Sequence, residues 1–294
     1  MSKRQISQAK GFQLATATAA LKTMRDDDGP RRFLVADEVG LGKTVVARTI
    51  ISESMKGRRR PLVVFYVCSN LNIANQNRKK LLELLETEDD QKRASARSDR
   101  LTLAANPNNR PKHERYNLYT LTPDTSIPLY RGRGGFGRVE ERALIFRLLT
   151  KRFPSLDCST VRKFFRWRAS TRTWNRALAQ FENIEEIHRL QNAFLDVLGS
   201  EKWEFPYVDS TSIFQAIDSE KGMQLLGKFR NALAITAFRE IQPDLIIFDE
   251  FQRFRNVLID PPGRLADTLT KAIRGNGKRG DPGVLLLSAT PYKL

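Results

Sequence analysis

The segment Asp37-Glu38-Val39-Gly40-Leu41-Gly42-Lys43-Thr44 combines residue types and a spacing that suit the binding of nucleotide phosphates. A glycine turn that opens a helix directs its backbone N–H groups at one point, where they can hold anionic phosphate oxygens. We expect Lys43 to reach the β- and γ-phosphates and the hydroxyl of Thr44 to be a ligand of Mg²⁺. The alternative is a glycine-rich turn with a surface lysine, because Asp37 stands where the general pattern has glycine.

Two carboxylates follow an apolar run further along the chain. The run Leu245–Phe248 leads directly into Asp249 and Glu250. At the carboxyl end of a strand, these side chains would lie where ligands bind in open α/β folds. We expect Asp249 to share the Mg²⁺ with Thr44, and Glu250 to orient and deprotonate an attacking water. An acidic pair in this position is also a common helix cap, so its assignment depends on the phosphate site.

A parallel sheet is needed to bring these two segments together. Apolar runs bounded by turn residues predict buried strands, and Leu101–Ala104 is a further candidate. The runs are Phe33–Ala36, Leu62–Val67, Leu118–Leu121, Leu245–Phe248 and Val284–Leu287. Helical patterns cover Lys43–Met55, Ile73–Leu85 and most of Val139 to Phe238, with breaks near Phe153-Pro154 and Pro206. These patterns predict an α/β protein with a mainly parallel sheet flanked by helices and a helical insertion over residues 130–240.

The composition is that of a globular protein. Of 294 residues, 40% are apolar and 28% are charged, which excludes wholesale disorder. The apolar runs are too short to span a bilayer, and Met1–Lys10 lacks a secretory pattern. Two cysteines, Cys68 and Cys158, cannot form a disulfide framework, and with the two histidines they make no metal-ligand spacing. We expect a cytoplasmic protein with no membrane partner.

The charge is strongly positive and unevenly distributed. Fifty Lys and Arg residues against 33 Asp and Glu give +17, which favours a polyanion such as nucleic acid, although it also supports solubility. Residues 121–180 contain 13 basic and 4 acidic side chains, whereas residues 181–240 contain 6 and 10. The insertion is therefore predicted to have an electrostatic surface of its own.

Within the insertion, Val161–Arg176 interleaves basic and aromatic residues. One interpretation is a nucleic-acid track, in which Arg166 and Arg168 contact phosphates and Trp167 stacks on a base. The other is an amphipathic helix with its aromatic side chains in the core and its arginines in solvent. Acidic residues of the next block could neutralise these arginines, which would favour the second interpretation. They are Glu182, Glu185, Glu186, Glu201 and Glu204.

The loop before this segment has a formal G-x-G-x-x-G pattern at Gly132, Gly134 and Gly137. A dinucleotide-binding fingerprint belongs to a regular βα alternation, which does not follow here. We expect instead a flexible basic loop, whose Arg131 and Arg133 contact the backbone of nucleic acid.

Taken in order, the motifs resemble those of the first RecA-like domain of superfamily-two helicases and translocases. Asp37–Thr44 resembles motif I in the form found in Swi/Snf-type DNA translocases, where aspartate also replaces the first glycine. Asp249-Glu250-Phe251-Gln252 resembles the DExx-box motif II, and Ser288-Ala289-Thr290 resembles motif III. The sequence around Asp37 and Asp249 is most similar to bacterial helicases of this type.

The resemblance implies roles that the patterns alone do not assign. Gln13 would read adenine, Gly40 and Gly42 would hold the phosphates, and Gln252 would act in catalysis with Lys43, Asp249 and Glu250. Ser69, Asn70 and Thr122 would contact the nucleic-acid backbone, and Ser288 and Thr290 would couple that contact to the nucleotide. ATP and Mg²⁺ are the implied cofactors, and nucleic acid, with DNA favoured over RNA, is the implied partner.

The expected function is that of the ATP-binding half of a nucleic-acid-dependent ATPase that hydrolyses ATP to ADP and phosphate. In the family a second RecA-like domain follows motif III and supplies arginine fingers, whereas this sequence stops at Leu294. We therefore expect a second RecA-like domain or subunit as a partner, and weak hydrolysis without it. The alternatives are a non-catalytic module that binds ATP and DNA, and another P-loop ATPase of the AAA+ or ABC kind.

Overall fold

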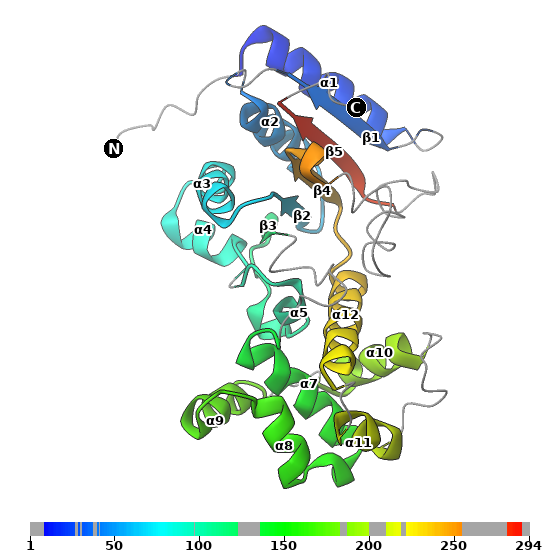
Figure 1. The fold of residues 1–294 in the computed structure, drawn as a ribbon. Helices are drawn as coiled ribbons and strands as arrows, with labels where there is room; N and C mark the ends of the chain where they lie inside the picture. The colour runs from blue at the N-terminus through cyan, green and yellow to red at the C-terminus, as the bar shows by residue number, and fades with distance from the viewer. Residues whose placement is uncertain are drawn as a thin grey trace. The chain divides into compact units, whose positions relative to one another are not determined.

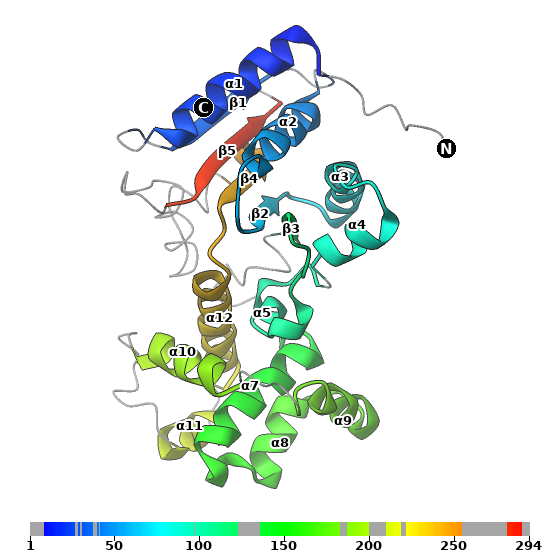
Figure 2. The same ribbon diagram turned by 180° about the vertical axis from the view of Figure 1, so that it is seen from behind.

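The computed structural model of the chain contains two compact units. Its described residues are 9–26, 29, 31–37, 40, 42–96, 98–122, 136–182, 187–199, 210–218, 222–254 and 281–289. Unit 1 comprises residues 1–99, 110–126 and 241–294, and unit 2 comprises residues 100–109 and 127–240. Figures 1 and 2 show the helices and strands of both units from opposite sides.

Unit 1 is built on a five-stranded sheet in which every pairing is parallel. The strands lie in the order β1-β5-β4-β2-β3. Their bounds are Arg32–Ala36 (β1), Leu62–Val67 (β2), Tyr116–Leu121 (β3), Leu245–Asp249 (β4) and Gly283–Ser288 (β5). Each of the five predicted apolar runs lies within one of these strands, so those predictions are confirmed. The chain is therefore an α/β protein with a parallel sheet.

The helices of unit 1 are α1 (Gly11–Arg25), α2 (Lys43–Met55), α3 (Leu71–Leu82) and α4 (Glu88–Ala94). Helix α2 has the predicted bounds. Helix α3 begins two residues before the predicted Ile73, because the side chain of Asn70 accepts a hydrogen bond from the N–H of Asn72 (2.7 Å) and caps the helix. The periodicity of the sequence did not predict α1.

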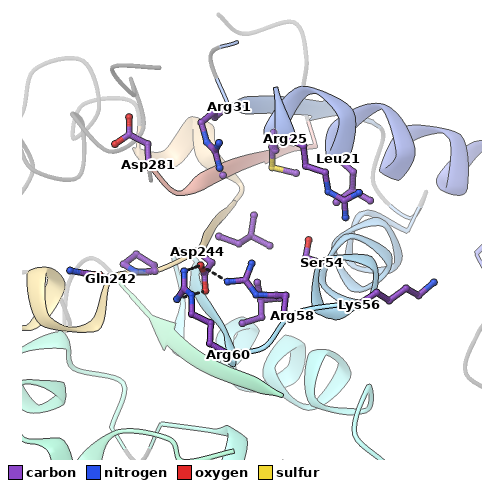
Figure 3. Close-up of a pocket in the computed structure, with 15 residues that line it drawn as sticks. Leu21, Arg25, Arg31, Ser54, Lys56, Arg58, Arg60, Gln242, Asp244 and Asp281 are labelled. Atoms are coloured by element: carbon purple, nitrogen blue, oxygen red, sulfur yellow. Dashed lines mark hydrogen bonds and ion pairs between the residues drawn. The ribbon is translucent and has the colours of Figure 1, made fainter. Parts of the chain in front are cut away.

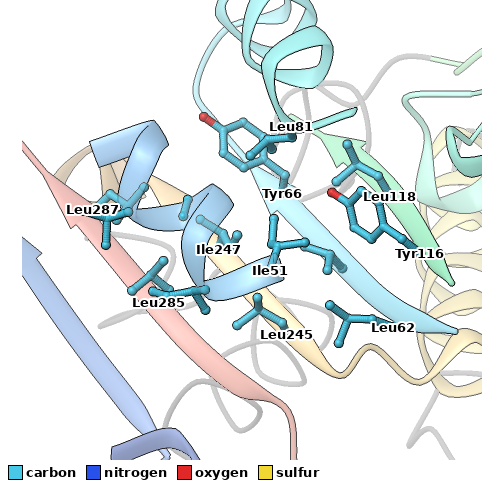
Figure 4. Close-up of a cluster of buried hydrophobic side chains, with 14 of the residues drawn as sticks. Ile51, Leu62, Tyr66, Leu81, Tyr116, Leu118, Leu245, Ile247, Leu285 and Leu287 are labelled. Carbon is cyan, nitrogen blue, oxygen red and sulfur yellow. The ribbon is translucent and has the colours of Figure 1, made fainter. Parts of the chain in front are cut away.

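Alternate side chains of the strands form one hydrophobic core with α1, α2 and α3 (Figure 4). Tyr66, Ile247 and Leu287 point to the same face of the sheet as Ile51 of α2. Because side chains alternate along a strand, Asp249 continues the row of Leu245 and Ile247 on this face. The alternation therefore directs the Asp249 side chain toward the helices rather than away from them.

The described elements of unit 2 are helical. They are α5 (Leu101–Ala104), α7 (Val139–Arg152), α8 (Ser159–Arg166), α9 (Thr171–Ala179), α10 (Ile187–Gly199), α11 (Ser210–Asp218), α12 (Gly222–Ile241, whose last residue belongs to unit 1) and the short 3₁₀ turns η1 (Pro107–Asn109) and η2 (Pro154–Leu156). The predicted break at Phe153-Pro154 is confirmed, and Pro206 lies outside the described residues. The predicted strand Leu101–Ala104 is wrong: this buried segment forms a helical turn, and leucine and alanine favour that conformation when no strand pairs with them.

A buried carboxylate organises the interior of unit 2. Glu141 is 0% exposed and accepts hydrogen bonds from Thr102 (2.6 Å), Arg100 (3.0 Å) and Arg230 (3.3 Å). Gly137 has φ +66, and a Cβ there would lie 2.6 Å from Nε of Arg230. The last glycine of the G-x-G-x-x-G pattern is therefore explained by the close approach of this ion pair.

The amino-terminal edge of the sheet contains a cavity of about 580 Å³ (Figure 3). Asp244, which precedes β4, accepts hydrogen bonds from Arg58 (2.6 Å), from Arg60 and from the N–H of Val63 (2.9 Å). Arg25 lies in the last turn of α1, where a cation stabilises the helix dipole. These structural roles account for three of the four arginines at the cavity, Arg31 being the fourth, and the cavity by itself assigns no ligand.

Among the described residues, no helix is both long and apolar enough to cross a membrane.

We expect Asp244→Ala to lower the free energy of unfolding by about 1–3 kcal/mol, since it leaves the donors of Arg58, Arg60 and Val63 without their acceptor. Urea denaturation measures the change. Asp89→Ala is the matched control, because the Asp89 side chain is 89% exposed and meets Lys92 only at 3.5 Å. Its effect should stay below about 0.5 kcal/mol. Equal losses in the two variants would contradict a structural role for Asp244.

Candidate functional site

The parallel sheet gathers the predicted chemical groups at its carboxyl edge. Asp37 follows β1, Ser69 follows β2, and Asp249 and Glu250 lie at the end of β4. Strand β5 lies between β1 and β4, and its last residue, Ser288, pairs with Ala36 of β1. Segments that are far apart in sequence therefore meet at the edge where open α/β folds bind their ligands.

The glycine turn between β1 and α2 has the backbone that its residues predict. Gly40 (φ +93) and Gly42 (φ +81) are both in the left-handed region, and Gly42 is the N-cap of α2. Lys43 is the first residue of the helix, and its Nζ donates to the carbonyl oxygen of Asp37 (2.8 Å). The helix N-terminus, the lysine and the hydroxyl-bearing Thr44 therefore lie together at the start of α2; Glu38, Val39 and Leu41 lie outside the described residues.

Gln13 lies directly against this turn. Its side chain on α1 is buried, and its Oε1 accepts a hydrogen bond from the N–H of Lys10 (2.8 Å). A Cβ at Gly42 would lie only 2.4 Å from Nε2 of Gln13. The sequence placed Gln13 at the nucleotide site by resemblance alone, and the structure brings its amide to the glycine turn.

The carboxylate of Asp249 is held by two side chains that the sequence analysis did not identify. The hydroxyl of Tyr66 on β2 donates to Oδ2 of Asp249, and Nδ2 of Asn77 on α3 donates to the same oxygen (3.1 Å). Nδ2 of Asn77 also donates to the Tyr66 hydroxyl (2.6 Å). Tyr66 lies within an apolar run, so nothing marked it as a functional residue. The sequence indicated only that Leu62, Val64 and Tyr66 occupy alternate positions of the strand, and so point to the same face.

Burial raises the pKa of Asp249 above its usual range. The hydrogen bond from Tyr66 lowers this pKa, the charge of Glu250 raises it, and the charge of Lys43 lowers it. Since the folded state binds this proton more tightly than the unfolded state does, the contribution of Asp249 to stability falls as the pH rises through its folded pKa. The ionised carboxylate is thus unfavourable in the folded chain and would be stabilised by a cation.

Glu250 turns out of β4 in a strained conformation. Its φ is +56, which is rare for a residue other than glycine, and such strain is concentrated at functional sites. The hydroxyl of Ser69 donates to its Oε2 (3.3 Å). Gln252, on the turn η3 (Phe251–Phe254), has a buried Oε1 with no hydrogen-bond partner in the described part of the chain.

The free thiol of Cys68 reports the negative potential of the site. Burial raises its pKa to about 11, the backbone near Asn70 lowers it, and the charges of Asp249 and Glu250 raise it. These two carboxylates therefore concentrate negative charge at this edge, Lys43 offsets part of the charge at Asp249, and Thr44 is the next residue of α2 after that lysine. Hard oxygen ligands with excess negative charge are what Mg²⁺ requires, so these residues fit the ion.

The remaining predicted residues are placed in different ways. Asn70 caps α3 with its side chain, Thr122 follows β3 and is buried, and Ser288 is buried at the end of β5. Arg131, Arg133 and Thr290 lie outside the described residues. Contact of Ser69, Asn70 and Thr122 with nucleic acid stays a prediction.

In unit 2, some residues of Val161–Arg176 are placed as the amphipathic-helix interpretation expects, and others as the nucleic-acid interpretation expects. Phe165 and Trp174 are core residues, 0% and 3% exposed, whereas Trp167 is 45% exposed. Arg166 donates to the hydroxyl of Thr171 (2.9 Å), and the guanidinium of Arg168 lies 5.6 Å from the ring of Trp167. Of the acidic block, Glu182 pairs with Arg147 (2.9 Å) instead; Glu185, Glu186, Glu201 and Glu204 lie outside the described residues.

Comparison of the chain with protein-family models, with curated protein sequences and with solved structures gives no match. The residues and the geometry of the site are therefore the basis on which a function can be assigned.

We expect Tyr66→Phe to raise the pKa of Asp249 further, because it removes a hydrogen bond that favours the ionised carboxylate. A ¹³C NMR titration of the aspartate carboxyl groups should show Asp249 titrating at higher pH than in the unchanged chain. Tyr116→Phe is the matched control: this tyrosine of β3 is fully buried, and its hydroxyl has no hydrogen-bond partner among the described residues. A shift to lower pH, or equal shifts in both variants, would contradict the role of Tyr66.

Proposed function

We propose that this chain is the RecA-like ATP-binding part of a nucleic-acid-dependent ATPase of the helicase or translocase type. The observation that carries the proposal is that the parallel sheet brings the start of α2, with Lys43 and Thr44, and the end of β4, with Asp249 and Glu250, to the same edge. These segments are distant in sequence, and Lys43 is near enough to Asp249 for its charge to lower the pKa of that carboxylate. Structural ion pairs alone do not require a glycine turn and a helix N-terminus at the same place.

The residues of this edge divide the binding of MgATP among them. The N–H groups at the start of α2 and the ammonium group of Lys43 would hold the phosphates, and Gln13, against Gly42, would face the base. Thr44 and Asp249 would hold Mg²⁺, which supplies positive charge to the phosphate oxygens. Tyr66 and Asn77 would keep the Asp249 carboxylate in one orientation, as partners of a metal ligand do.

The reaction is the transfer of the γ-phosphoryl group of ATP to water. The water oxygen forms the new bond to phosphorus, the bond to the β–γ bridging oxygen breaks, and ADP leaves with the electron pair. Glu250 would accept the proton of the water, because it stands beside Asp249 on a backbone that turns it away from the strand. The hydroxyl of Ser69 donates to Glu250. By resemblance, Ser69 belongs to a segment that contacts the nucleic-acid backbone. This hydrogen bond would therefore connect the bound nucleic acid directly to Glu250, the general base.

Two substitutions test the assignment. Lys43→Ala should weaken ATP binding by roughly 10- to 150-fold, since it removes a charged hydrogen-bond donor to the phosphates. Glu250→Gln should keep ATP binding and lower the rate of phosphate release by about 10²- to 10⁴-fold, since the amide cannot accept the proton. Calorimetry measures binding, and a phosphate-release assay with and without single-stranded and duplex DNA measures turnover.

Lys56→Ala is the matched control for Lys43, because Lys56 follows the other end of α2 and is 68% exposed beside Glu53. It should leave ATP binding unchanged. Tight ATP binding by Lys43→Ala would refute the site. The unchanged chain should retain weak hydrolysis without a second RecA-like domain. Binding of ATP with no hydrolysis at all, with or without nucleic acid, would therefore support the non-catalytic alternative instead.

A further inference from the structure

Trp167 occupies an exposed and strained position in unit 2. Its φ of 51° and ψ of −125° are those of the first central residue of a type II′ turn, and the N–H of Ala169 closes that turn on the carbonyl oxygen of Arg166 (3.1 Å). Glycine is the residue that this position favours. Instead a large aromatic side chain stands here, and 45% of it is exposed. The conformation therefore indicates that the ring serves a purpose other than folding.

The indole ring is already held in a fixed orientation. The ring of Phe136 is stacked on it, with the centroids 3.6 Å apart and the planes 14° from parallel. The hydrogen bond from Arg166 to Thr171 ties the end of α8 to the start of α9. A ring that is ordered before binding loses little entropy when a second planar group stacks on it.

The surroundings of Trp167 carry unbalanced positive charge. Residues 159–179 contain six basic side chains and no acidic one. Arg162 is paired with Asp157 (2.6 Å), but Lys163, Arg168, Arg172 and Arg176 are exposed and have no carboxylate partner among the described residues. Arg172 and Arg176 line one hollow of about 470 Å³ on α9. A planar platform with Arg168 over its ring, on a segment whose cations other than Arg162 have no carboxylate partner among the described residues, matches the bases and phosphates of a nucleic acid.

We infer that unit 2 binds single-stranded nucleic acid, with a base stacked on Trp167 and phosphates on Lys163, Arg168, Arg172 and Arg176. A single strand is the ligand that fits, because its bases are free to leave their own stack, whereas those of a duplex are not. The inference deepens the proposed function and rests on it for its biological meaning, since it names the strand on which the ATPase acts. The binding event itself needs no nucleotide.

The central experiment is the binding of a fluorescently labelled oligo(dT) by the whole chain, without ATP, measured by anisotropy. Trp167→Gly removes the platform and also relieves the backbone strain, which offsets the lost stacking on Phe136, so the melting temperature should change little. The affinity for oligo(dT) should nevertheless fall by roughly 5- to 150-fold. Quenching of tryptophan emission on addition of oligo(dT) should be lost in the same variant.

Three further variants separate stacking from charge and from general aromatic exposure. Phe214→Ala removes another exposed aromatic ring of unit 2, 40% exposed on α11, and should leave the affinity unchanged. Arg172→Gln and Arg176→Gln should each reduce the slope of log affinity against log salt by about 0.7, with the quenching by Trp167 retained.

The inference is overturned if Trp167→Gly binds oligo(dT) as tightly as the unchanged chain. It is also overturned if this variant loses affinity for oligo(dT) and for duplex DNA by the same factor, because Trp167 would then not distinguish the unstacked bases of a single strand from those of a duplex. Lys43→Ala should bind oligo(dT) normally, and Trp167→Gly should bind ATP normally. A chain that holds oligo(dT) through Trp167 but never hydrolyses ATP would refute the proposed function and leave this inference standing.

Discussion

The register of the parallel sheet is the constraint on which the candidate site depends. Leu287 of β5 pairs with Asp249 of β4, and Ser288 of β5 pairs with Ala36 of β1, so a single strand joins the acidic segment to the glycine turn. If β4 slipped by one residue, Asp249 would point to the opposite face, away from Tyr66, Asn77 and the start of α2. That slip is costly because Leu245 and Ile247 would exchange faces with Ile246 and Phe248, and since all four are buried, both faces of the strand would have to repack. The apolar pattern thus positions a polar group.

The site holds negative charge in a place where the chain alone does not favour it. Burial raises the pKa of both Asp249 and Cys68, and the nearby Glu250 acts in the same direction in each case. Tyr66 and Asn77 order one carboxylate oxygen, and Lys43 offsets part of the charge. Such an arrangement is less stable than an apolar one would be, and a bound cation would remove the cost. Sites that bind ligands commonly retain an unfavourable charge of this kind in the free protein.

The basic side chains of unit 2 lie in two kinds of environment. Arg100 and Arg230 lie inside and share the buried carboxylate of Glu141, where an unpaired cation would be very costly. The basic side chains of α8 and α9 lie outside, and most of them have no acidic partner in the described part of the chain. The positive charge of unit 2 is therefore composed of a structural part and a surface part. Only the surface part is available to a polyanion.

Local sequence determined the five strands, the bounds of α2 and the turn at Gly40 and Gly42, because these depend on runs of apolar residues and on glycine's access to positive φ. It also identified Lys43, Thr44, Asp249 and Glu250 as one set. It did not determine which side chains hold Asp249, since Tyr66 and Asn77 reach it only through the register of β2 and the packing of α3. The same limit explains the wrong prediction of a strand at Leu101–Ala104, whose apolar pattern suits a strand but which has no strand to pair with. It also explains why the periodicity of Val161–Arg176 could not distinguish the buried Phe165 from the exposed Trp167. Burial and pairing are decided by neighbours distant in sequence, and only the tertiary structure supplies them.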